Sequence, residues 1–236
     1  MTSPGTPPAR PAPPHKLWGG RFAAGPAAVM RLRAMGARCT KLEPLAADGG
    51  SADPMSHYRP AAYQTMHQGV RVVGADLKQP AGQKKLHALL AQTDVLITSF
   101  RPSALKKLGI APQALKQTYP SLIQVSIVGS PGPKAEHPGH DLTYMAECGL
   151  VPDLALPASL FADMGGSLLV TEAVLKALLQ RQQRSGAAVF NDRFIHDFLK
   201  NQSRLSPRYG DRSGTCGRYH RWGTIIRHLC AYSGRR

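Results

Sequence analysis

Short β-branched runs alternate with helix-length segments through the middle of the chain, and this alternation constrains the fold more than any other feature. Residues 94–98 and 122–128, DVLIT and LIQVSIV, read as strands, and residues 71–76, RVVGAD, read as a third. Pro80 and Pro102 follow two of these runs, and proline suits the first turn of a helix. Strands that alternate with helices predict an α/β fold built on a parallel sheet.

Further elements extend this pattern on both sides. A helix is predicted from Pro26 to Gly36, and a short extended segment at 39–43 follows it. A long helix is predicted over residues 164–184. Its expected core contacts are Leu168, Leu175, Leu178 and Leu179.

The two ends of the chain lack the alternation. Residues 1–25 hold six prolines in their first fourteen positions, and proline sustains neither a helix nor an inner strand. We therefore predict a disordered N-terminal lead over 1–25. Residues 190–236 mix Arg, Gly, Ser, Tyr and His without a period, which predicts a disordered, basic, irregular tail. The folded domain is expected to span residues 26–189.

The formal net charge of +16 suggests a nucleic-acid partner, because basic surfaces attract phosphate backbones. The excess is densest in residues 191–236, where ten Lys and Arg stand against three Asp and Glu. A charge run without aromatic platforms or a recognition motif is usually solvated surface, so we rank this hypothesis last. No apolar run approaches the roughly 18 residues of a membrane span, and no signal-peptide core is present. We therefore expect a cytoplasmic protein with no membrane partner.

The four cysteines are widely scattered and do not form the framework of a disulfide-rich protein. Two of them stand near two histidines, in the order Cys216, His220, His228 and Cys230. Their spacing, C-x3-H-x7-H-x-C, matches no CxxC-based zinc framework, so no metal site is predicted.

One candidate site follows the strand at 94–98, because ligands of open α/β sheets bind beyond the carboxyl ends of the strands. Ser99, Phe100 and Arg101 form a turn into the helix that begins at Pro102. Backbone N–H groups at a helix start and a neighbouring guanidinium suit a phosphate or a carboxylate. The alternative is an ordinary strand–helix connection with a solvated arginine.

Three titratable residues follow in later loops. His140 and Asp141 come after a flexible turn at 129–133, and histidine is readily poised for proton transfer near neutral pH. Asp163 comes just before a predicted helix, whose start should keep its carboxylate ionised as a base or a nucleophile. The alternatives are an inert surface His–Asp pair and a plain N-cap aspartate.

Five segments in order resemble the class III CoA-transferase family, which includes L-carnitine dehydratase/bile-acid-inducible-type proteins, formyl-CoA transferase and α-methylacyl-CoA racemase. They are residues 25–44, 70–115, 120–133, 138–149 and 161–167. In the most recognisable segment, DLKQPAG leads to TDVLITSFRPSALKKLG. The last two, PGHDLTYMAECG and FADMGGS, resemble the active-site segments of the family.

The resemblance implies a Rossmann-like parallel sheet with flanking helices, as the incomplete large domain of an interlocked homodimer. Coenzyme A or acyl-CoA is then a substrate, and no permanently bound cofactor is implied. Asp163 matches the carboxylate that accepts the acyl group in transferases and moves a proton in racemases. His140, followed by Asp141, matches the partner base of the racemase branch. The CoA moiety would pass Lys78, Ser99, Phe100, Arg101, Lys107 and Leu108.

The chain also departs from the family. The opening strand of the family should lie before Pro26, where this chain has HKLWGGRFAA, and the similarity stops near Phe190. Family members are considerably longer, and the tail reads like out-of-frame sequence joined to a truncated gene.

Four hypotheses result. The leading one is α-proton exchange on a 2-substituted acyl-CoA by His140 and Asp163. The others are CoA transfer between carboxylic acids through an acyl anhydride on Asp163, an inactive truncated remnant, and the nucleic-acid binder.

Overall fold

The computed structural model describes residues 15–19, 24–46, 51–130, 132–151, 156–183 and 190–194. These residues belong to the first of the two compact units into which the chain divides, residues 1–200. The second unit, residues 201–236, lies outside the described residues, and so do Cys216, His220, His228 and Cys230.

Within the described residues the fold is built on one six-stranded sheet, in which every pair of neighbouring strands is parallel. The strands are β1 (His15–Gly19), β2 (Arg38–Glu43), β3 (Arg71–Gly74), β4 (Val95–Thr98), β5 (Ile123–Val128) and β6 (Phe190–Phe194). Their order, β3-β2-β1-β4-β5-β6, is that of a Rossmann sheet. The predicted parallel α/β fold is confirmed.

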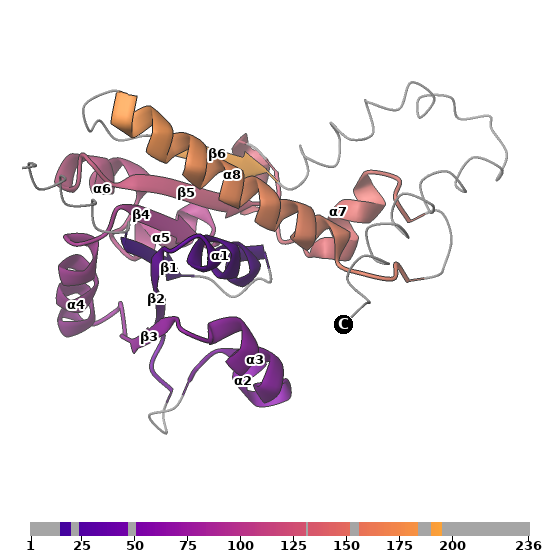
Figure 1. The fold of residues 1–236 in the computed structure, drawn as a ribbon, viewed down its shortest axis with the longest axis horizontal. Helices are drawn as coiled ribbons and strands as arrows, with labels where there is room; N and C mark the ends of the chain where they lie inside the picture. The colour runs from indigo at the N-terminus through magenta and orange to yellow at the C-terminus, as the bar shows by residue number, and fades with distance from the viewer. Residues whose placement is uncertain are drawn as a thin grey trace, which may run out of the picture. The chain divides into compact units, whose positions relative to one another are not determined.

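Helices connect the strands and cover the sheet. They are α1 (Ala24–Ala34), α2 (Pro54–Tyr58), α3 (Pro60–His67), α4 (Pro80–Leu90), α5 (Pro102–Lys107), α6 (Pro112–Thr118), α7 (Asp141–Glu147) and α8 (Phe161–Gln183), with a 3₁₀ turn η1 (Gly132–Glu136). Figure 1 shows the long helix α8 running beside β5 and reaching α7 at one end. As predicted, proline opens α4 and α5. No helix of this described part has the length and hydropathy that a membrane span requires.

Two apolar clusters lie on opposite faces of the sheet. Val95 and Ile97 of β4 join the cluster formed with α1, α7 and α8, whereas Leu96 joins the cluster formed with α4, α5 and α6. Successive side chains of a strand point to opposite faces, so a strand covered on both sides must be apolar throughout. This burial explains why β4 reads as a continuous apolar run in the sequence.

The structure corrects the boundaries predicted at both ends. β1 falls inside the predicted lead 1–25, yet it lies within the sheet, paired with β2 and β4. β6 falls inside the predicted tail 190–236 and pairs with β5. The predictions were wrong for these two segments because parallel strands gain their backbone hydrogen bonds from neighbours distant in sequence, which local composition does not reveal. Ala24 and Gly25, also inside the predicted lead, begin α1 and are buried, and the remaining residues of both predicted ends lie outside the described residues.

The predicted core face of α8 is also wrong. Leu168, Leu175 and Leu179 are 47%, 40% and 61% exposed, and of the four predicted contacts only Leu178 packs against the core. The buried face is formed instead by small residues, Val170, Ala173, Val174 and Ala177. Alanines of α1, Ala24 and Ala28, are buried in the same cluster. Small side chains let two helices approach closely, so the contact with α1 selects them over the leucines.

Candidate active site

Several elements distant in sequence meet around a small cavity of about 120 Å³, here called the central cavity. It lies beyond the carboxyl ends of β4 and β5, where open α/β sheets bind ligands. The loop after β4, the start of α7 and the first turn of α8 each contribute side chains. Five of the predicted site residues line it together: Ser99, Phe100, Arg101, His140 and Asp163.

Asp163 is the third residue of α8, so it lies within the first turn and is not the N-cap that one hypothesis expected. Its backbone N–H donates a hydrogen bond to Oδ1 of Asp141 at 2.9 Å. Asp141 is buried, and it is not among the residues that line the central cavity. The predicted site residue Asp141 therefore connects the start of α7 to the start of α8.

The carboxyl group of Asp163 has an unusual pKa. Burial raises the pKa of Asp163 to about 6; the charge of Asp141 adds to this rise, and His140 opposes it. The direction expected from the helix start is wrong, because burial and a like charge outweigh the helix dipole. At pH 7 about a tenth of a group with this pKa carries a proton, so both protonation states are accessible.

His140 is the N-cap of α7, with an extended backbone at φ −132°. Its backbone N–H donates to Oγ1 of Thr143 at 3.4 Å, as part of a capping box. The cap fixes the position of His140, which is exposed and lines the central cavity. His140 is also close enough to Asp163 for its charge to lower the pKa of that carboxyl.

Tyr144 lines the same cavity, although the sequence analysis did not select it. Burial raises its pKa, and the charges of Asp163 and Glu147 raise it further. A side chain at Gly129 or Gly139 would collide with the Tyr144 ring, so both glycines make room for it. Its position four residues after His140, on the same side of α7, is the sequence signal that could have identified it.

The helix start after Arg101 binds a carboxylate, but this carboxylate is a side chain of the protein itself and not an external ligand. Glu136 accepts hydrogen bonds from the backbone N–H and the Oγ of Ser103, both at 2.7 Å. These bonds lower the pKa of Glu136, and the charges of Arg101 and Lys107 contribute. The expected phosphate or carboxylate position at this helix start is therefore occupied by the side chain of Glu136.

A second cavity of about 700 Å³, here called the large cavity, lies beyond the ends of β2, β3 and β4. Its walls are mostly aliphatic, including Leu86, Leu96 and Ile110. The predicted residues Lys78, Phe100 and Leu108 also line it, and Phe100 lines the central cavity as well. The exposed Lys107, at the end of α5, lines none of the cavities described here.

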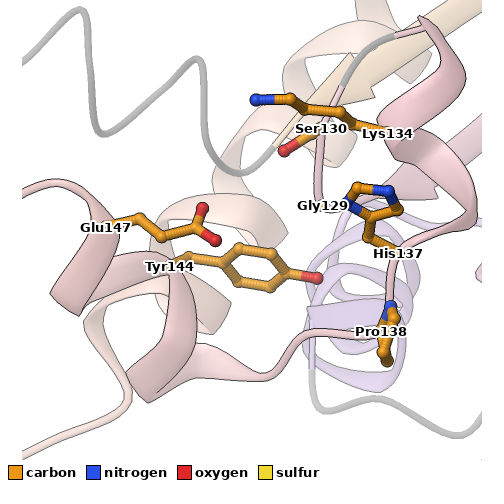
Figure 2. Close-up of a pocket in the computed structure, with 7 residues that line it drawn as sticks. All are labelled: Gly129, Ser130, Lys134, His137, Pro138, Tyr144 and Glu147. Carbon is orange, nitrogen blue, oxygen red and sulfur yellow. The ribbon is translucent and has the colours of Figure 1, made fainter.

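A third cavity of about 340 Å³, here called the outer cavity, adjoins the central cavity and is lined by Tyr144 (Figure 2). Figure 2 shows the side chains around one opening, with Lys134 and Ser130 across from the Tyr144 ring and Glu147 across from His137. The walls that it shares with the central cavity are Gly129, His137, Pro138 and Tyr144. The sequence analysis did not predict this cavity.

Among the described residues, no three His, Cys, Asp or Glu side chains gather in a way that could hold a metal ion.

The chain resembles known proteins over most of its length. The family model described as CoA-transferase family III matches residues 17–191. Human alpha-methylacyl-CoA racemase is 29% identical over 201 residues, which are 78% of this chain and 50% of the human protein. The (R)-2-hydroxy-4-methylpentanoate CoA-transferase of Clostridioides difficile is 31% identical over 178 residues, 69% of this chain and 45% of that protein.

A solved structure agrees with these relatives. A CAIB/BAIF family protein from Brucella suis superposes with a TM-score of 0.73 at 26% identity, covering 85% of this chain and 59% of that one. The chain spans about half the length of the curated relatives it matches.

Proposed function

The chain belongs to CoA-transferase family III, and from this premise we propose that it acts on an acyl-CoA thioester in the central cavity. The observation that carries the proposal is the convergence of His140 and Asp163 on one cavity, with the pKa of Asp163 raised to about 6. A carboxyl group with a pKa near the working pH both accepts and donates protons readily. This favours α-proton exchange on a 2-substituted acyl-CoA.

In the proposed reaction the two residues exchange one proton each with the α-carbon. Neutral His140 removes the α-proton, and the electron pair of the broken C–H bond moves into the thioester to form an enolate. Protonated Asp163 then returns its proton to the α-carbon from the other face. The histidine ends as imidazolium and the aspartate as carboxylate, and proton exchange with water restores both.

The enolate oxygen needs a hydrogen-bond donor. Gly165 and Gly166 are buried beyond the first turn of α8, where helical N–H groups already bond to the preceding turn. We therefore assign this role to the Tyr144 hydroxyl, whose raised pKa keeps it protonated at neutral pH.

The large cavity is the proposed place for the CoA moiety. It opens at the carboxyl ends of three parallel strands and reaches the central cavity at Phe100. Lys78 supplies a positive charge at its wall, which suits a phosphate. Coenzyme A is a substrate in this proposal, and the homodimer and the cytoplasmic location remain predictions.

CoA transfer between carboxylic acids is the second candidate. It is favoured by the similarity to the transferase of Clostridioides difficile. In this reaction the Asp163 carboxylate attacks the thioester carbonyl, the C–S bond breaks, and CoA leaves as the thiolate. The thiolate then attacks the Asp163 carbonyl of the anhydride, which releases the first carboxylate and leaves CoA as a thioester on Asp163. The carboxylate of the second acid attacks this thioester and expels the CoA thiolate, which gives a second anhydride. The thiolate attacks the acyl carbonyl of that anhydride, so the new acyl-CoA forms and the Asp163 carboxylate is restored. His140 has no essential part in it.

Deuterium wash-in separates the two reactions. With 2-methylbutanoyl-CoA in D₂O, the protein should catalyse the incorporation of deuterium at the α-carbon of the thioester. His140→Ala should lower the rate of this incorporation at least about 10²-fold. His57→Ala, at an exposed histidine of α2, is the matched control and should leave the rate unchanged. Mass spectrometry of the thioester follows the exchange. CoA transfer that survives His140→Ala, without wash-in by the original protein, would contradict proton exchange and favour the second reaction.

Coenzyme A should stabilise the folded chain. A ligand bound only to the native state adds about 2.7 kcal/mol at a concentration 100 times its Kd, which thermal unfolding detects as a higher Tm. Lys78→Gln should reduce the shift, whereas Lys116→Gln, at an exposed lysine of α6, should not. A folded sample with no shift would remove CoA binding from the proposal and favour the inactive remnant.

A further inference from the structure

The three cavities follow one another through shared walls. Phe100 lines both the large cavity and the central one, and Tyr144 is one of the four residues that line both the central cavity and the outer one. If the CoA moiety occupies the large cavity and the thioester lies at Asp163, the outer cavity is the further space that adjoins the thioester site through shared walls. The acyl chain extends from the thioester carbonyl on the side away from CoA, so it would lie in this space.

Polar side chains surround the outer cavity. Lys134 and Ser130 lie on one side, while His137 and Glu147 face each other across the opening (Figure 2). The apolar contribution among these residues comes from Pro138 and the Tyr144 ring. A purely aliphatic acyl chain placed here would separate Lys134 and Glu147 from water without offering them a hydrogen bond, which is costly.

We propose that the outer cavity is the acyl subsite, and that it selects a short acyl group with a carboxylate at its far end. The inference rests on the proposed function, because it takes the thioester position from Asp163. The methylene groups of the acyl chain pack on Tyr144 and Pro138, and the distal carboxylate accepts charge-assisted hydrogen bonds from Lys134 and the Ser130 hydroxyl. The volume of about 340 Å³ suits a short chain.

The two opposite charges at the outer cavity should affect the binding of a carboxylated ligand in opposite ways. Lys134 attracts a distal carboxylate and Glu147 repels it. Removing the charge of Lys134 should therefore weaken the binding of a carboxylated ligand, and removing the charge of Glu147 should strengthen it. The binding of an uncharged ligand of equal length should change little in both cases. A merely structural role for these exposed residues would not produce opposite signs.

The test compares two thioethers that cannot react, S-(3-carboxypropyl)-CoA and S-butyl-CoA, by calorimetric titration of the full chain. Their chains have the same length, but the first ends in a carboxylate and the second ends in a methyl group. The carboxylated ligand should bind more tightly. Lys134→Gln should weaken its binding about fivefold, and Glu147→Gln should strengthen it by a similar factor, with S-butyl-CoA little affected by either. Lys116→Gln is the control and should alter neither ligand.

Each outcome decides one question. If CoA binds but the two thioethers bind equally and Lys134→Gln changes nothing, the acyl-subsite proposal is overturned and the proposed function stands. If S-butyl-CoA binds more tightly, the outer cavity selects an apolar chain and the proposal is also overturned. If neither thioether nor CoA binds to folded protein, the proposed function itself fails, and the acyl subsite fails with it.

Discussion

Asp163→Asn should lower turnover at least about 10²-fold and at the same time raise the free energy of unfolding at pH 7. The loss of rate follows from removing the group that exchanges a proton, or attacks the thioester, in either candidate reaction. The gain in stability follows from the raised pKa of Asp163, because its ionised form is disfavoured in the folded chain. Asparagine keeps the size of the side chain and removes the charge.

The sign of the pH dependence follows from two pKa values. The carboxyl group ionises near 3.8 in the unfolded chain and near 6 in the folded chain. Between these values the folded chain holds the extra proton, so stability falls as the pH rises from about 4 to about 6. Above pH 6 the whole penalty is present. With allowance for the part of Asp163 that faces solvent, asparagine should recover about 1–2 kcal/mol at pH 7.

Urea unfolding of the original protein and of Asp163→Asn, at pH 7 and at pH 4, measures the change in the free energy of unfolding. The difference between them should be largest at pH 7 and should shrink toward pH 4. Glu172→Gln removes the same charge from an exposed position on α8 and is the matched control. Full activity in Asp163→Asn, or a loss of stability at pH 7, would contradict the assigned role and leave Asp163 as a structural residue of the first helical turn.

Lys41→Met should destabilise the fold by about 3–5 kcal/mol, a large part of the stability of a typical domain. Lys41 is only 1% exposed. Its Nζ lies 2.5 Å from Oδ2 of Asp53 and 2.9 Å from Oε2 of Glu43, and 4.9 Å from the centre of the Tyr63 ring. Methionine would fill much of the space but would leave two buried carboxylates without their cation.

The pKa of Asp53 shows how this cluster works. Burial acts to raise it, but the hydrogen bonds from Lys41 and from the Met55 backbone outweigh burial, so the pKa lies below its usual value. The stability that this group contributes is therefore present above the unfolded pKa of about 3.8 and is lost as the pH falls through the lower folded value. In Lys41→Met most of this contribution should disappear at pH 7.

A triple variant separates charge from packing. Lys41→Met combined with Glu43→Gln and Asp53→Asn removes all three charges, and asparagine can still accept the N-cap hydrogen bond from Met55. It should regain much of the stability that Lys41→Met loses, as urea unfolding would show. Lys116→Met on the surface should cost less than about 0.5 kcal/mol. If Lys41→Met lowered the free energy of unfolding by no more than Lys116→Met does, the ion pairs of Lys41 would not stabilise the fold.

The strands from β2 to β5 and helices α4 and α5 were predictable because each carries its own local signal. A strand covered on both faces, such as β4, must be apolar along its whole length, and this requirement is written into consecutive residues. Pro80 and Pro102 mark helix starts by their fixed backbone angle. The segments that hold Asp163, His140 and Arg101 were found for the same reason, since each follows or precedes a recognisable element.

β1, β6 and the core face of α8 were not predictable in this way. The hydrogen bonds of β1 come from β2 and β4, so a short segment beside a proline-rich stretch becomes a strand within the sheet. The exposed leucines of α8 satisfy helical periodicity as well as Val170 and Val174 do. Packing against α1, the sheet and α7 decides which side of the helix is buried.

For the candidate site, the sequence by itself determined the residue types and the loops that carry them, because strand ends and helix starts have local signatures. The tertiary structure decided their chemistry. Asp141 approaches Asp163 from another helix and helps to raise its pKa. Glu136 occupies the helix start that was expected to bind an external anion, and Tyr144 fills the space left by Gly129 and Gly139. Charge interactions and burial depend on distance in space, and distance along the chain does not report it.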